Sequence, residues 1–160
     1  MTKRILNLGV LLLCMLACVT LSSCGSDDNK KDEPTISNVR PADLTTPWMI
    51  INAEEVANEE FSFLAFDGNR AAHATMNENG VRNITIYDSW KVDGDKLYLG
   101  GHLAGTIKKG QSQGIQVIFI NEITYVPSNV KVDGSSIEDE FIKGGVTREM
   151  IWQLLEQGAE

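Results

Sequence analysis

The clearest pattern of hydrophobic and polar positions in the chain runs from Val81 to Val92. Strict alternation there is typical of a strand with one buried face and one wet face. The apolar parity holds Ile84, Ile86, Trp90 and Val92, and the other parity holds Asn83, Thr85, Tyr87, Ser89 and Lys91. Asp93-Gly94 then predicts a turn, and Leu97-Tyr98-Leu99 a returning strand. We therefore expect a β-hairpin at the centre of the chain.

Other apolar runs predict further short strands. Phe61 to Phe66 ends at the turn signal Asp67-Gly68-Asn69. Arg70 to Met76 is followed by Asn79-Gly80, which suits the positive backbone angles of a tight hairpin. Ile115 to Val126 carries apolar residues on both parities in its first half, so we expect it to be covered on both sides. Short, evenly spaced strands with turn signals are typical of an antiparallel barrel or sandwich.

The periodicity changes near the C-terminus. Phe141-Ile142 is expected to close the sheet, and helical spacing begins after Gly144-Gly145. Thr147 can cap a helix, and Gly158 can end it. The apolar side of this helix is predicted to hold Met150, Ile151, Leu154 and Leu155. Such a stripe usually packs on a core, and the alternative is a helix that binds a partner.

The first residues are typical of a secretory signal peptide. Lys3-Arg4 is a short positive region, and Ile5 to Leu21 is a mostly apolar region without charge. Leu21-Ser22-Ser23-Cys24 resembles the lipobox of bacterial lipoproteins. This resemblance implies that residues 1–23 are removed and that the Cys24 thiol carries an acyl chain such as palmitate. An ordinary signal peptide with a chance cysteine is the alternative.

A polar tether is predicted at residues 24–35, where Gly25 to Pro34 reads GSDDNKKDEP. Asp27-Asp28 resembles the acidic tethers of Bacteroidota lipoproteins sent to the outer face of the outer membrane. The resemblance implies a lipid-anchored protein of the bacterial outer membrane that is exposed at the cell surface. Placement facing the periplasm stays open, as does a simple spacer role for the tether.

Composition and charge exclude several functions. The 160 residues are enough for one domain with its own core, and the net charge of −8 argues against a nucleic-acid partner. The leader carries Lys3 and Arg4 and no acid, so its removal takes the net charge to −10. Cys14 and Cys18 leave with the leader, and Cys24 becomes the anchor. No thiol then remains for redox or thiol catalysis.

A second resemblance concerns the folded domain. The segment Trp90 to Leu99, which reads WKVDGDKLYL, resembles a recurrent segment of small lipocalin-like lipoproteins of Bacteroidota. Phe61 to Phe66 followed by a turn fits the same order, so the likeness covers roughly residues 46–126. The glycine of the lipocalin Gly-x-Trp motif is absent, because Thr46-Pro47 precedes Trp48.

This resemblance implies a mainly β fold for residues 36–145, namely an antiparallel barrel or half-barrel, with a short helix at 146–160. It also implies an apolar cavity at the mouth of the barrel. The family's ligand contacts follow no fixed motif, so no binding residue is transferred from it.

No arrangement of residues predicts catalysis, a cofactor or a metal site. His73 and His102 are the only histidines, whereas zinc sites need three or four ligands. Acidic residues cluster at Glu54-Glu55, Glu59-Glu60 and Glu138-Asp139-Glu140, which is typical of solvated turns. Asp93-Gly94-Asp95 is too short for an EF-hand calcium loop. We expect a protein that is not an enzyme.

Asp88 interrupts the apolar parity of the central hairpin. A strand end or a bulge explains it most simply, because an unpaired buried carboxylate is costly. The alternative is a polar group that orients a ligand inside a cavity. In that case Asp88, Trp90 and Tyr98 are the candidate ligand-binding residues.

Two functions remain. The first is a lipid-anchored, lipocalin-like barrel that binds a small apolar ligand, with an interior lined by Ile84, Ile86, Trp90, Val92, Leu97 and Leu99. The alternative is a β-sandwich accessory module that contacts a protein or glycan at the cell surface. That module should have a filled core and an exposed aromatic or apolar patch.

Overall fold

A computed structural model describes residues 36–54, 60–77, 79–112, 114–131 and 134–159. The predicted leader (1–23), the lipidation site Cys24 and the tether (24–35) lie outside the described residues.

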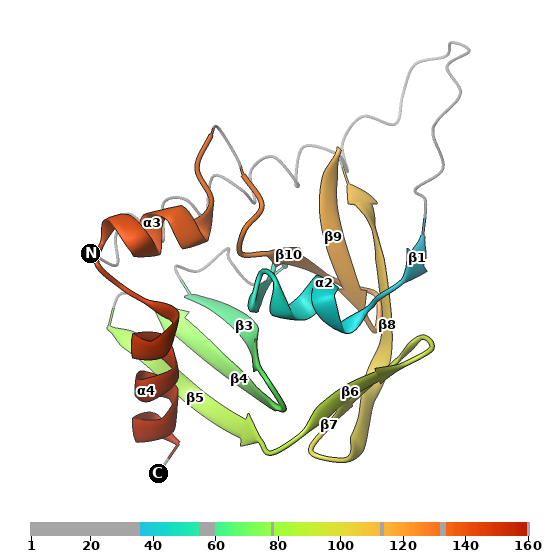
Figure 1. The fold of residues 1–160 in the computed structure, drawn as a ribbon, viewed down its shortest axis with the longest axis horizontal. Helices are drawn as coiled ribbons and strands as arrows, with labels where there is room; N and C mark the ends of the chain where they lie inside the picture. Colours follow the sequence, from blue (N-terminus) through green and yellow to red (C-terminus); the bar gives the residue numbers. More distant parts are fainter. Residues whose placement is uncertain (1–35, 55–59, 78, 113, 132–133, 160) are drawn as a thin grey trace.

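Most of the described chain forms one antiparallel sheet of ten strands (Figure 1). The strands are β1 (Ser37–Asn38), β2 (Met49–Asn52), β3 (Glu60–Asp67), β4 (Arg70–Asn77), β5 (Gly80–Tyr87), β6 (Trp90–Asp93), β7 (Lys96–Leu99), β8 (His102–Ser112), β9 (Ile115–Ile120) and β10 (Ile123–Pro127). The helices are α2 (Pro41–Thr45), α3 (Ile137–Lys143) and α4 (Arg148–Gly158).

The strand order is that of a barrel that is open at one junction. From β2 to β10 each strand pairs with its neighbour in the chain, except that β5 does not pair with β6. The ring is continued by β10, which pairs with β2. The expected fold class, a mainly β antiparallel half-barrel with a short C-terminal helix, is therefore confirmed.

The central alternation belongs to two strands rather than one. β5 pairs with β4, whereas β6 pairs with β7, and the chain changes partner at Asp88-Ser89. The prediction of one strand from Val81 to Val92 was therefore wrong. The alternation looked continuous because the alternating apolar residues of both strands fall on even-numbered positions. Asp88 is exposed at the break, as expected for a strand end. The β6–β7 hairpin with its turn after Asp93 is confirmed.

The segment from Ile115 to Val126 is also two strands, which turn at Asn121-Glu122. Both turn residues have positive φ, +50° and +74°, which asparagine tolerates better than most residues. The longest strand, β8, was not predicted because glycines interrupt its pattern. Its residue Gly105 leaves room for the Asn121 side chain, which accepts from the Thr106 N–H and donates to the Ala104 carbonyl.

Phe141-Ile142 does not close the sheet, because it lies in α3. The Ser136 side chain caps this helix by accepting from the Asp139 N–H (3.1 Å), and the Asp139 carboxylate accepts from the Ser136 N–H (2.9 Å). This reciprocal pair is a capping box. Local hydrogen bonds therefore favour a helix over the strand that two apolar residues suggested.

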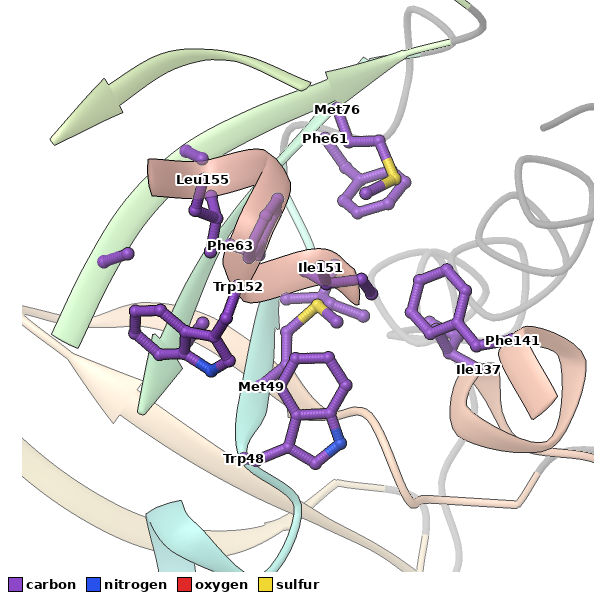
Figure 2. Packing of buried hydrophobic residues seen from close by; sticks show 14 residues of the cluster. Trp48, Met49, Phe61, Phe63, Met76, Ile137, Phe141, Ile151, Trp152 and Leu155 are labelled. Carbon is purple, nitrogen blue, oxygen red and sulfur yellow. The ribbon is translucent and has the colours of Figure 1, made fainter. Parts of the chain in front are cut away.

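The half-barrel has two large hydrophobic clusters on opposite faces, besides a small one at Ala53, Val117 and Val126. The inner cluster fills its concave side with residues from β2–β4, from β7–β10, and from α2 and the segment before it. Its members are Val39, Leu44, Ile50, Leu64, Phe66, Ala71, Leu97, Leu99, Ile107, Ile118, Ile120 and Tyr125. The outer cluster joins β2–β5 to α3 and α4: Trp48, Met49, Ile51, Phe61, Phe63, Ala65, Ala72, Ala74, Met76, Ile137, Phe141, Ile151, Trp152 and Leu155. Figure 2 shows side chains of α3 and α4 meeting those of β2 and β3 in the outer cluster.

The expected single interior was wrong, since the six residues divide between the two faces. Ile84 and Ile86 pack on the outer cluster, while Trp90, Val92, Leu97 and Leu99 belong to the inner side. The change of strand partner at Asp88-Ser89 causes this division. Buried residues of both clusters lie between Val39 and Leu155, so the domain has its own core without residues 1–35.

α4 packs on the sheet as predicted, but its buried side is narrower than expected. Ile151 and Leu155 are buried together with Trp152. Met150 and Leu154, expected on the same side, are 46% and 52% exposed. In Figure 1, α4 lies alongside β4 and β5.

Candidate functional site

A groove of about 260 Å³ opens where the two C-terminal helices meet the start of β2. Its lining residues come from three places: Trp48 before β2, α3 with the loop that follows it, and the first residues of α4. They are Trp48, Glu138, Phe141, Ile142, Gly145, Val146, Thr147 and Arg148. The groove is mostly apolar and has a few polar groups, which is the usual make-up of a binding site.

Trp48 forms the floor of the groove in an unusual backbone conformation. Its φ is +48°, and the Met49 N–H donates to the Pro47 carbonyl (2.6 Å) around it. This is the rarer, strained form of the γ-turn. Its carbonyl accepts from the Phe66 N–H (2.7 Å), which ties the strained residue to the sheet. Strain of this kind persists where the surroundings impose it, and it is concentrated at functional sites.

Glu138 lies at one end of the groove and shares a hydroxyl with the backbone. The buried Ser128 Oγ contacts both the Pro47 carbonyl oxygen and Glu138 Oε1, the latter at 2.6 Å. A hydroxyl has one proton, so it can donate to only one of these two oxygens. If Ser128 donates to Pro47, a protonated Glu138 donates to Ser128 and every contact is satisfied.

The surroundings of Glu138 favour this protonated form. Burial is the largest cause that raises the pKa of its carboxyl, and the Asp139 carboxylate raises it further. The hydrogen bond with Ser128 and the charge of Arg148 act in the opposite direction. The net shift is upward, because a charged carboxylate is poorly solvated there.

Arg148 lines the groove, and only one of its three side-chain nitrogens donates a hydrogen bond within the described residues. Its Nη2 donates to the Phe66 carbonyl (2.7 Å) and to Asp67 Oδ1 (3.1 Å). Its guanidinium carbon lies 5.7 Å from the ring centre of Trp48, a cation–π contact. Within the described residues, Nε and Nη1 of Arg148 have no hydrogen-bond partner. The groove therefore offers unused donors beside an apolar floor.

Large apolar side chains are exposed on both helices of this region. Ile142, at the wall of the groove, is 72% exposed, and Met150 and Leu154 of α4 are about half exposed. Single exposed apolar residues are ordinary, so of these three only Ile142, which lines the groove, bears on the candidate site.

Two other hollows, of about 210 and 340 Å³, lie near α2 and β1 and are more polar. Between them Lys109 Nζ donates to the Asp43 carboxylate (2.8 Å). Burial raises the pKa of Asp43, but hydrogen bonds from Lys109 and Arg40 outweigh it and hold the pKa below its ordinary value. This charge pair already satisfies itself, so these hollows are weaker candidates than the groove.

The three ligand-binding residues expected from the sequence do not come together. Asp88 is exposed between β5 and β6. Trp90 faces the inner cluster, where its ring meets Phe66 at 5.0 Å and its Nε1 donates to the Gly68 carbonyl (2.9 Å). Tyr98 is paired with Lys91, one residue along from Trp90, and so lies on the opposite face of the hairpin.

Within the described parts of the chain, no three histidine, cysteine or acidic side chains are grouped to hold a metal ion. No helix in the same residues has the length and apolar character needed to cross a membrane. Compared with known proteins, the chain matches no family model, no curated protein and no solved structure.

The residues of the groove were not expected from the sequence. Trp48 drew notice for the strand-like run that it begins and for the missing glycine before it, and Glu138 as part of a charge run; neither was expected at a site. A usable signal was present, since Ser136-x-x-Asp139 before two apolar residues is typical of a capped helix. That helix would have placed Glu138 and Ile142 beside the C-terminal helix.

Proposed function

We propose that the protein is a lipid-anchored lipoprotein of the bacterial outer membrane whose folded domain is a non-catalytic module that binds a partner protein. The single observation that carries the binding function is the apolar groove at Trp48, next to the exposed Ile142. The anchor rests on the lipobox-like Leu21-Ser22-Ser23-Cys24 and the acidic tether after it.

A partner outside the barrel is favoured over a small apolar ligand within it. The inner cluster fills the concave side, where Phe66, Leu97 and Ile107 have no exposed surface. A filled core with an exposed apolar surface is what an accessory module requires. An acidic domain of charge −10 after leader removal would also have to be held at the membrane by lipid, because anionic lipids repel it.

The anchor is tested with Cys24→Ser in the full chain, expressed in a bacterium that processes lipoproteins. We expect the native protein to take up labelled palmitate and to fractionate with the outer membrane. The variant should lose the label and leave the outer-membrane fraction. Equal labelling of both proteins would contradict lipidation at Cys24.

Binding through the groove is tested by photo-crosslinking in living cells. The photoreactive residue p-benzoylphenylalanine replaces Ile142 in one protein and Leu103 in the control, since Leu103 is 58% exposed but lies on β8. A discrete crosslinked species from position 142 alone is expected. Equal crosslinking from both positions, or none from position 142, would refute the groove as the binding surface.

A further inference from the structure

The size of the groove limits what can enter it. A dry cavity of about 150 Å³ holds a benzene ring, whereas pockets for whole small molecules are about 300–1,000 Å³. The groove, at about 260 Å³, lies between these limits. It therefore suits one large apolar side chain better than a complete small-molecule ligand.

The charged groups of the groove do not favour an anion. The positive charge of Arg148 is already paired with Asp67, and Glu138 is itself an acid in the groove lining. An anionic group would gain little there, and the acidic domain as a whole repels it. Neutral donors and acceptors fit better, because Arg148 keeps unused N–H groups on Nε and Nη1.

A protein main chain supplies such neutral groups on either side of each side chain. An extended segment can place a carbonyl at Arg148 and its N–H at Glu138 Oε2, which has no hydrogen-bond partner within the described residues. The apolar side chain between them would then contact Trp48, Phe141 and Val146. Main-chain hydrogen bonds with a side-chain pocket are a recurrent mode of peptide recognition.

We propose that the groove binds an extended peptide segment of the partner protein, seating one leucine- or phenylalanine-sized side chain over Trp48 while Arg148 donates to a main-chain carbonyl. This inference rests on the proposed function and names the chemistry of its partner.

The test is an NMR titration of residues 25–160 with capped pentapeptides of the form Ac-Gly-Ser-X-Ser-Gly-NH2. With X as leucine or phenylalanine we expect saturable shifts of the Trp48 indole and Gly145 amide signals at millimolar peptide. With X as alanine, binding should be roughly tenfold weaker or more, because less apolar surface is buried. Equal binding of the alanine peptide, or no shift by the leucine peptide up to about 10 mM, would overturn the proposal.

Decanoate tests the competing ligand chemistry. If decanoate saturates the Trp48 signal and the leucine peptide does not, the occupant is an anionic amphiphile and the peptide proposal is wrong. If crosslinking from position 142 succeeds in cells but no apolar peptide binds, the proposed function stands and this inference fails.

Matched variants locate the binding. Ile142→Ser should weaken the leucine peptide about fivefold or more, with little effect on folding because the side chain is 72% exposed. Leu103→Ser removes a similar exposed side chain far along the chain and should bind as the native protein does. Equal loss in both variants would contradict the placement.

Discussion

Leu154 and Leu155 are neighbours on α4, and replacing each with alanine measures how far this helix belongs to the core. Leu155 has no exposed surface and lies in the outer cluster, whereas Leu154 is 52% exposed. The two substitutions have the same chemistry and nearly the same effect on helix propensity. Their difference therefore reports burial alone.

The expected cost for Leu155→Ala is about 3 kcal/mol of the free energy of unfolding, from lost transfer free energy plus the cavity left behind. Leu154→Ala should stay within about 0.5 kcal/mol of the native protein. For a domain of this size, 3 kcal/mol lowers Tm by roughly 10 °C. Urea unfolding followed by tryptophan fluorescence gives both free energies, since Trp152 lies in the same cluster.

The same pair decides between two roles for the helix. If α4 did not pack on the sheet and served only to bind a partner, neither substitution would lower the free energy of unfolding by much, and the two variants would unfold alike. A difference below about 0.5 kcal/mol would thus refute the packing described above. It would also show that the strained Trp48 and the groove cannot depend on α4 for their shape.

Three further changes test separate parts of the structure. Because burial raises the pKa of Glu138 on folding, its contribution to stability is present below its unfolded pKa and is lost as pH rises through its folded pKa. Glu138→Gln should therefore flatten the fall of Tm as pH rises above the ordinary glutamate pKa of about 4.3, and parallel curves for the two proteins would contradict a raised pKa. Gly105→Ala should cost about 1–3 kcal/mol in urea unfolding, because a Cβ there would overlap the Asn121 amide that bonds to Thr106 and Ala104; an unchanged midpoint would contradict this clamp. Trp90→Phe should cost about 1 kcal/mol, since it loses the hydrogen bond to Gly68 but keeps an aromatic edge on Phe66; a loss as large as that of Leu155→Ala would show that the indole has a greater packing role.

The sequence predicted the local pairings better than the long-range ones. The strands β3, β4, β6 and β7 follow from alternation and from turn signals that lie within a few residues of each other. The change of partner at Asp88 could not be predicted in this way. β5 pairs with β4 and β6 pairs with β7, and no local pattern around Asp88 says that the two strands have different partners. Ile86 and Trp90 both fall on even-numbered positions, so the alternation assigned them to one interior. Once each strand has its partner, Ile86 packs on the outer cluster and Trp90 on the inner one.

Glycine-rich β8 was missed for a related physical reason. Its pattern is interrupted by Gly105 and Gly110, which make room for the side chains of Asn121 and Phe119 from elsewhere in the sheet. A glycine in a strand weakens the strand's own propensity, and the compensating contact comes from a residue nine or more positions away. Such an exchange leaves no local signal.

The capping pattern at Ser136 could have placed α3 beside α4, but it could not reveal the contacts that join the strained Trp48 to Glu138, because these form only in the folded chain. The carbonyl of Pro47, just before the strained Trp48, is a contact of Ser128, and the same hydroxyl contacts Glu138. The Ser128 carbonyl also accepts from the Glu138 N–H (3.2 Å), so one serine joins the start of β2 to the start of α3. A strained backbone and a poorly solvated acid both cost stability. Their meeting at an open apolar groove is the reason that binding is proposed at this place rather than elsewhere on the domain.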